Sequence, residues 1–206
     1  MLLVIGNKNY SSWSLRPWIA LKMLGVPFDE KRIALRRPET KAEILRYSAA
    51  GHVPILRDGD TVVWDSLAIL EYLAERHPQL WPADRAQRAK ARAISAEMHS
   101  GFPHLREHMS MNTRKRYPGQ GRTPEVLAEI ARIDAIWSEA KGPFLFGNFT
   151  AADAMYAPVV LRFRTYEVEV RKKSYRDAML ALPAMREWVE AAEREPESIP
   201  ELDLYG

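Results

Sequence analysis

The sequence contains no cysteine in its 206 residues. This absence excludes disulfide bonds, a thiolate nucleophile and any metal site that uses cysteine sulfur. The sequence also lacks an uninterrupted apolar run of about 18 residues, the minimum for a membrane-spanning helix. Its first residues, Met-Leu-Leu-Val-Ile-Gly, carry no basic leader and no long apolar segment, so we expect no signal peptide. These absences predict a cytoplasmic protein with no membrane partner.

The sequence also lacks a strong excess of either charge, because 30 basic and 27 acidic residues leave a formal net charge of only +3. The two basic clusters, at 114–116 and 171–173, are short, whereas a nucleic-acid surface normally needs a longer array of basic residues on one face. We therefore expect no nucleic-acid partner. The sequence contains neither a glycine-rich phosphate loop nor a nucleophile elbow. His104 and His108 have the spacing of a helical metal site, but no HExxH pattern accompanies them, so we predict solvent exposure and no metal.

The most informative stretch is 10–18, which joins a short apolar run at 2–5 to an apolar segment that ends before Gly25. This pattern predicts a strand, a loop and a helix. The predicted helix start is rich in serine, at positions 11, 12 and 14. Serine hydroxyls there can cap the first turn, and they can also stabilise an anion at the positive end of the helix dipole. Capping is the commoner role, and this stretch alone leaves both roles open.

Strand and helix signals alternate over residues 1–77 and predict the order β-α-β-α-β-β-α. We expect strands at 2–5, 28–35, 53–56 and 61–64, and helices at 14–24, 38–47 and 67–76. Asp58-Gly59, in a turn between the last two strands, predicts a β-hairpin. A proline-containing linker follows at 78–83. Helices are then expected at 84–110, 124–140, 151–166, 174–180 and 184–194, so the fold class is an α/β domain at 1–77 followed by an all-helical domain at 84–206.

Two junctions in the α/β part carry candidate binding residues. Val53-Pro54 stands where a strand begins, and proline is tolerated there; alternatively, a cis-proline turns the Val53 backbone groups outward to pair with a peptide-like ligand. Asp65-Ser66 stands at a strand-to-helix junction, which predicts an N-cap. Exposed N–H groups and the Ser66 hydroxyl at such a helix start can also hold a carboxylate, while Asp65 can hold an amino group. His52 could supply a cation for a second carboxylate.

A helix start is also predicted at 147–153. Thr150 is followed three residues later by Asp153, which resembles a capping box. In such a box, two side chains satisfy backbone N–H groups that the first helical turn leaves free. We therefore predict a structural role for this pair, in folding and not in catalysis.

The order of these features resembles the cytosolic glutathione transferases over essentially the whole chain. The serine loop, Val-Pro before the third strand, Asp-Ser after the fourth strand and the hairpin resemble their glutathione-binding half. The linker and a helical second half with Asn-Phe-Thr-x-x-Asp at 148–153 complete the resemblance. It implies a thioredoxin-like N-terminal domain, a helical-bundle C-terminal domain and a homodimer.

The resemblance also implies a role for each candidate residue. Glutathione is the co-substrate, and Ser11 or Ser12 is the catalytic hydroxyl. His52 holds the glycine carboxylate of glutathione. Val53 with Pro54 holds the cysteinyl backbone, and Asp65 with Ser66 holds the γ-glutamyl end. The second substrate, a small hydrophobic electrophile, is expected between the domains, and its candidate lining consists of Trp13, Phe102, Arg106 and Met109.

Three functions compete on these residues. The first is a detoxifying glutathione transferase that accepts several electrophiles. The second is a glutathione-dependent cis–trans isomerase, because the loop Ser-Ser-Trp-Ser-Leu-Arg at 11–16 resembles the Ser-Ser-Cys-x-x-Arg loop of the zeta class, which includes maleylacetoacetate isomerases. Trp13 stands where that class has cysteine. The third is a non-catalytic binding module on the same fold. A pure scaffold has no need of the full set of glutathione-binding positions, so the sequence favours the transferase.

Overall fold

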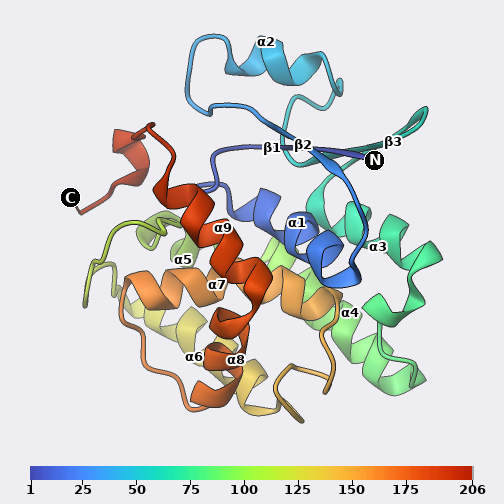
Figure 1. Ribbon diagram of the computed structural model, residues 1–206. Coiled ribbons are helices and arrows are strands. Elements are labelled where there is room, and N and C mark those ends of the chain that lie inside the picture. The colour runs from blue at the N-terminus through green and yellow to red at the C-terminus, as the bar shows by residue number, and fades with distance from the viewer. Residues whose placement is uncertain (206) are drawn as a thin grey trace.

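The computed structural model describes residues 1–205, and four short strands near its N-terminus form one mixed sheet (Figure 1). They are β1 Leu2–Ile5, β2 Asp29–Arg32, β3 Ile55–Asp58 and β4 Thr61–Trp64, in the order β2-β1-β3-β4. β1 pairs in parallel with β2 and antiparallel with β3, and β3 pairs antiparallel with β4. The predicted strand order along the chain and the predicted hairpin are therefore confirmed.

The third strand differs in its bounds from the prediction of 53–56. Pro54 has no N–H group to give to the sheet, so the ladder begins only at Ile55 and runs on to Asp58. Asp58 pairs with Thr61, which shortens the hairpin turn to Gly59 and Asp60. Gly59 has φ +58°, a left-handed conformation that two-residue hairpin turns require and that glycine adopts without strain.

Helices cover both faces of this sheet. Figure 1 shows α2 Thr40–Leu45 on one side, and α1 Ser12–Leu24 and α3 Ser66–Arg76 on the other. Side chains of a strand alternate between faces. Leu3 and Ile5 accordingly join the large core with α1, whereas Val4 joins a smaller core with Ile44 of α2.

The rest of the chain is helical. After a 3-10 helix, Pro78–Leu80, it contains α4 Arg85–Ser100, α5 Pro103–His108, α6 Pro124–Ser138, α7 Ala151–Thr165, α8 Lys173–Ala181 and α9 Pro183–Glu193, and a second 3-10 helix, Pro200–Leu202. α7 is almost wholly buried and packs against both α1 and α4, so it joins the sheet part to the helical part. The boundaries of the two domains at 77–78 and 83–84 stay a prediction.

The single helix predicted at 84–110 is wrong, because the chain breaks at Gly101 and Phe102. Pro103 disfavours a helical conformation of the residue before it, and Phe102 takes the left-handed conformation with φ +59°. The carbonyl groups of Met98 and Gly101, at the end of α4, accept hydrogen bonds from the Arg106 guanidinium. This side chain therefore satisfies part of the helix end that the break exposes.

We expect Gly101→Ala to destabilise the fold by about 1–3 kcal/mol, the usual cost of forcing extra volume into packed structure. A Cβ at this position would lie 2.7 Å from the backbone oxygen of Glu97, which cannot move without disturbing α4. Urea unfolding measures the effect. Ser100→Ala is the matched control, because this exposed hydroxyl bonds only to its own helix. Equal stability of both variants would contradict the predicted clash.

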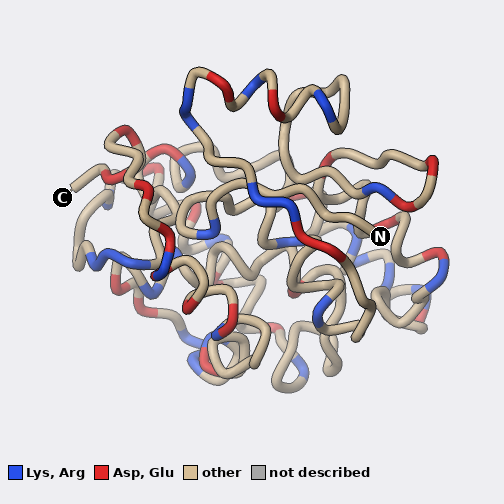
Figure 2. The backbone as a smooth tube through the Cα atoms, turned by 45° about the horizontal axis from the view of Figure 1, so that its top comes forward, with Lys and Arg blue, Asp and Glu red and all other residues tan. Residues whose placement is uncertain are grey.

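Figure 2 shows that Lys and Arg positions are interspersed with Asp and Glu positions along the described backbone. Within residues 1–205, none of the helices combines the length and the apolar character that crossing a bilayer requires.

The predicted capping box is confirmed: Thr150 and Asp153 exchange side-chain and backbone bonds at the start of α7.

Candidate active site

A cleft of about 720 Å³ opens where the β1–α1 loop, the segment before β3 and the starts of α1 and α3 meet the end of α4. Every predicted catalytic and glutathione-binding residue lines it: Ser11, Ser12, His52, Val53, Pro54, Asp65 and Ser66. Trp13 lines it as well. The Val53-Pro54 peptide bond is cis, as the second interpretation of this pair requires. The fold thus brings three separate segments to one cleft, while the role of each residue stays a prediction.

The other predicted substrate-binding residues do not reach the cleft wall. Met109 is fully buried and Phe102 nearly so, both in the core. The prediction placed them on one continuous helix with Arg106, and the break before Pro103 removes that alignment. Arg106 instead lies behind the wall, with its guanidinium carbon 4.8 Å from the centre of the Trp13 ring.

The serine hydroxyls at the start of α1 do not act as its cap. Ser11 occupies the N-cap position, but its side chain makes no capping bond. Its Oγ donates to Ser14 Oγ at 2.7 Å, and Ser14 Oγ also accepts from the Gly6 N–H at 3.1 Å. Ser12 Oγ accepts a bond of 3.3 Å from Arg162 Nη2 of α7. Capping is therefore not the role of these hydroxyls, and both Ser11 and Ser12 line the cleft.

The side chains of Arg16, Arg106 and Arg162 lie behind the cleft wall that Ser12 and Trp13 form. Arg16 stacks on Trp13 at 4.3 Å and donates from Nη1 to Ser66 Oγ at 3.2 Å. Burial, and then repulsion by Arg106 and Arg162, hold the pKa of Arg16 well below its ordinary value. Burial and repulsion by Arg106 also lower the pKa of Arg162 to about 9, which leaves it charged at neutral pH. The wall is therefore backed by positive charge.

Asp65 connects the sheet part to the helical part of the cleft. Its Oδ1 accepts from the N–H groups of Leu67 and Ala68, at 2.8 and 3.2 Å, which confirms the predicted cap of α3. Its Oδ2 lies 2.6 Å from Nε2 of His99 on α4. Burial opposes ionisation of Asp65, but the bonds from His99 and the two N–H groups outweigh it, so the pKa of Asp65 lies below its ordinary value. The cleft thus holds an ionised carboxylate next to Ser66, whose hydroxyl accepts from Arg16.

The amino-acid sequence of the chain matches known protein families over most of its length. Residues 10–76 match the profile of the glutathione S-transferase N-terminal domain, and residues 120–191 match that of the C-terminal domain. The probable maleylacetoacetate isomerase 2 of Drosophila melanogaster is 30% identical over 176 residues, which cover 80% of this chain and 74% of that protein. The chain belongs to the glutathione S-transferase family. The predicted family, fold class and enzyme class are thereby confirmed.

Solved structures of glutathione transferases superpose on nearly the whole chain. Maleyl pyruvate isomerase, a bacterial zeta-class member in its holo form, is 26% identical with a TM-score of 0.72, and the match covers 97% of this chain and all of that one, 100%. A glutathione transferase homolog from Burkholderia gl BGR1, with bound glutathione, has the same fold, with 23% identity, a TM-score of 0.72 and coverage of 94% and 98%. Homologues with this fold therefore bind glutathione.

The family also includes a relative whose name describes neither transferase nor isomerase activity. A stringent starvation protein A homolog of Coxiella burnetii is 28% identical over 174 residues, which cover 82% of this chain and 79% of that protein. Membership of the glutathione S-transferase family thus leaves the activity to be argued from the cleft.

Sequence reasoning missed several residues of this glutathione S-transferase cleft. His99, Arg36, Tyr10 and Trp64 line it, and Arg162 lies behind it. His99 is 34 positions from Asp65, and Arg162 is 150 positions from Ser12. No local pattern reports such contacts, because they depend on how α4 and α7 pack against the sheet part. The left-handed conformation of Arg36, with φ +59°, would have been equally hard to foresee for an arginine.

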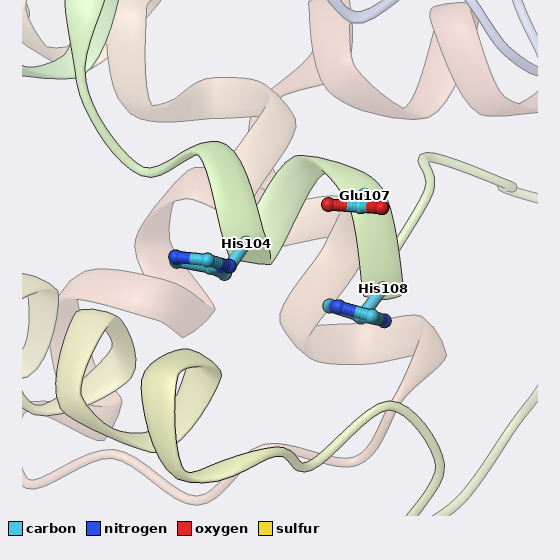
Figure 3. A group of neighbouring side chains, drawn as sticks. All are labelled: His104, Glu107 and His108. Atoms are coloured by element: carbon cyan, nitrogen blue, oxygen red, sulfur yellow. The ribbon is translucent and has the colours of Figure 1, made fainter.

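The histidine pair considered for a metal lies outside the cleft, on α5 (Figure 3). His104 is exposed, as predicted, and His108 is half-buried. Glu107 adds a third group, and one ligand-capable atom of each residue lies within 4.8 Å of the others. The sequence prediction found neither HExxH nor a flanking acidic pattern and so overlooked Glu107. We assign this group no role in the cleft.

Proposed function

We propose that this protein is a glutathione transferase that activates the thiol of glutathione as a thiolate, which attacks a small hydrophobic electrophile. One observation carries the proposal: the three separate segments that hold the predicted residues converge on one cleft that also contains charged groups of both signs. Family membership supports the same conclusion. The proposal needs no metal.

The cleft offers a partner for each polar group of glutathione. The Ser66 hydroxyl and the N–H groups at the start of α3 would hold the γ-glutamyl carboxylate, at the positive end of the helix dipole. Asp65 would hold the γ-glutamyl amino group through Oδ2, which is not used in capping. The Val53 backbone would pair with the cysteinyl residue, and His52, together with Arg36, which also lines the cleft, would hold the glycine carboxylate. This arrangement leaves the sulfur facing the start of α1.

The chemistry required at the sulfur is ionisation. A free thiol has a pKa of about 8.5, so only a few per cent is thiolate at neutral pH, and the thiolate is the nucleophile. A hydrogen bond donated to sulfur and the dipole of α1 both favour the charged form. Lowering the pKa by one unit requires about 1.4 kcal/mol, which one charge-assisted hydrogen bond supplies. The serine acts as a donor and does not itself ionise.

The test is conjugation of glutathione to a panel of apolar electrophiles, including an activated aryl chloride, by the wild type, Ser11→Ala and Ser12→Ala. We expect loss of one hydroxyl to lower kcat/KM about tenfold at neutral pH, since each pKa unit of the thiol changes the thiolate fraction tenfold. If both variants conjugate as fast as the wild type, neither serine is catalytic. Glutathione binding without any conjugation would support the non-catalytic module instead.

A second candidate is a glutathione-dependent cis–trans isomerase of the zeta type. It is favoured by the loop at 11–16 and by the similarity to proteins named as maleylacetoacetate and maleyl pyruvate isomerases. Both candidates use the same thiolate, so the substrate distinguishes them. Turnover of maleylacetoacetate by the wild type would establish the isomerase, and its absence beside measurable conjugation would exclude it.

The proposal includes a cytoplasmic homodimer with a role in detoxification. The resemblance to cytosolic glutathione transferases supports the dimer, and light scattering of the purified protein measures its mass directly. A mass near the 23.6 kDa of one chain would contradict the dimer.

A further inference from the structure

The positive charge buried behind the cleft is only partly compensated: the Asp65 charge acts on Arg16 and the Glu129 charge acts on Arg106. Arg16 is 1% exposed and Arg162 is 6% exposed, and Arg106 is half-buried beside them. In the part of the chain that the structure describes, none of these three arginines forms a salt bridge with a carboxylate. Burying a charge without a partner is costly. Arg16 Nε even lacks any hydrogen-bond partner among the described atoms. Such a cluster fits a site that receives an anion.

The cluster reaches the cleft through two hydroxyls, Ser66, which accepts from Arg16, and Ser12, which accepts from Arg162, and of these only Ser12 lies at the start of α1. Arg162 of α7 makes two hydrogen bonds through its guanidinium. Nη1 donates to the Met109 carbonyl, just after α5, and Nη2 donates to Ser12 Oγ at the start of α1. A serine oxygen that accepts a bond keeps its own hydrogen free to donate. Ser12 lines the cleft, so its hydrogen can be directed at a ligand there.

The neighbouring serine is arranged differently. Ser11 Oγ donates its hydrogen to Ser14 Oγ at 2.7 Å. Ser14 Oγ also accepts from the Gly6 N–H, so the Ser11 hydrogen is used in a bond within the protein. Of the two adjacent hydroxyls, only the one oriented by Arg162 has a hydrogen that is not already committed.

We propose that Ser12, oriented by Arg162, donates the hydrogen bond to the glutathione sulfur, and that the resulting thiolate supplies a further counter-charge to the arginine cluster. This inference rests on the proposed function and assigns Arg162 as a positioning residue that acts through Ser12. The thiol S–H bond breaks heterolytically, the electron pair stays on sulfur and the proton leaves to water. The serine keeps its own proton throughout.

The experiment is a titration of bound glutathione by thiolate ultraviolet absorbance, with the titration of the protein alone subtracted to remove tyrosine. The variants are Ser11→Ala, Ser12→Ala, Arg162→Met, Arg162→Lys and the double variant Ser12→Ala/Arg162→Met. Tyr10, His52, Asp65 and His99 also line the cleft, and Arg16 and Arg106 lie behind it. The subtraction removes Tyr10, and imidazole, carboxylate and guanidinium groups do not give the thiolate absorbance.

We expect Ser12→Ala and Arg162→Met each to raise the thiol pKa by about one unit, which lowers the thiolate fraction at neutral pH about tenfold. The double variant should show little further shift, because the arginine acts through the serine. Arg162→Lys should keep part of the effect, since it retains the charge but not the forked donor. Ser11→Ala should leave the pKa unchanged.

The matched control is Arg164→Met, two positions along α7. Arg164 is half-buried like Arg106 but donates to the Thr113 carbonyl at 3.1 Å, and it does not line the cleft. Its replacement should leave the thiol pKa unchanged. If Arg162→Met fails to fold, Ser12→Ala against Ser11→Ala still decides the assignment, because each removes only one oxygen atom.

Two results would overturn the inference. A raised pKa in Ser11→Ala with none in Ser12→Ala would assign the sulfur contact to the other serine. Additive shifts in the double variant would show that Arg162 does not act through Ser12. Failure of the proposed function looks different, because with wild-type protein that binds no glutathione, every variant shows only the thiolate transition of free glutathione at its ordinary pKa.

Discussion

Replacing Asp153 by alanine is expected to lower the free energy of unfolding by about 3–5 kcal/mol, since a buried donor left without its acceptor costs roughly 1–3 kcal/mol. The Asp153 carboxylate is fully buried at the start of α7. It accepts hydrogen bonds from the Leu145 N–H at 3.0 Å, the Thr150 N–H at 2.8 Å and the Thr150 hydroxyl at 3.0 Å. Alanine removes every one of these acceptors. Because α7 joins the sheet part to the helical part, the loss affects the whole fold.

Urea unfolding of wild type and Asp153→Ala measures this difference. Burial raises the pKa of Asp153 to about 6, so the measurement belongs at pH 8, where the carboxylate is ionised. Asp153→Asn keeps one oxygen and should fall between the two. Asp177→Ala removes an exposed carboxylate that pairs with Arg176, and such surface pairs contribute about 0–1 kcal/mol. A loss for Asp153→Ala no larger than that of Asp177→Ala would mean that the capping box contributes little.

Features whose determinants lie within a few residues could be predicted from the sequence. The hairpin follows from Asp58-Gly59, the cap of α3 from Asp65 and the start of α7 from Thr150 and Asp153, since each bond spans at most three positions. The break before Pro103 was equally local, and the prediction overlooked it in favour of the helical periodicity on either side. Turn, cap and proline signals within a few residues were thus sufficient to predict these local features.

Contacts between distant elements could not be predicted in the same way. The residues expected to bind glutathione come from loops that the sheet topology brings together, and all of them line one cleft, while their roles stay a prediction. The groups that contact them include His99 of α4 and Arg162 of α7, which lie far from them in the sequence. Arg162 looks like any other residue of a helix in the sequence, and only the packing of α7 against α1 directs it to Ser12. Which serine is oriented toward the cleft therefore depends on tertiary structure.

The loop that carries the serines is also held from the far end of the chain. The Glu195 carboxylate, just after α9, accepts from the N–H groups of Lys8 and Asn9 at 2.7 and 3.1 Å. Trp188 Nε1 of α9 donates to the Lys8 carbonyl at 2.9 Å. These bonds fix the loop before α1, so the position of Ser11 and Ser12 relative to the cleft depends on the last helix as well as on the first.

Asp65→Asn is expected to weaken glutathione binding about 10- to 100-fold, because a hydrogen bond to a charged group contributes roughly 1.5–3 kcal/mol and each 1.4 kcal/mol is tenfold in affinity. The substitution separates two roles of this side chain. Asparagine Oδ1 can still accept from the Leu67 and Ala68 N–H groups, so α3 stays capped. What is lost is the negative charge that would pair with the γ-glutamyl amino group.

Isothermal titration calorimetry with glutathione measures this affinity, and the thermal unfolding midpoint without glutathione checks the cap. The pKa of Asp65 lies below its ordinary value of about 3.9, so the carboxylate is charged throughout the pH range 5–7 and its contribution to affinity should be constant there. It should decline only as the pH falls through that lower pKa. Asp60→Asn, in the exposed hairpin turn, is the matched control. Unchanged affinity in Asp65→Asn would mean that the amino group binds elsewhere. A lowered unfolding midpoint would instead assign Asp65 mainly to holding α3 and, through His99, the two halves of the cleft together.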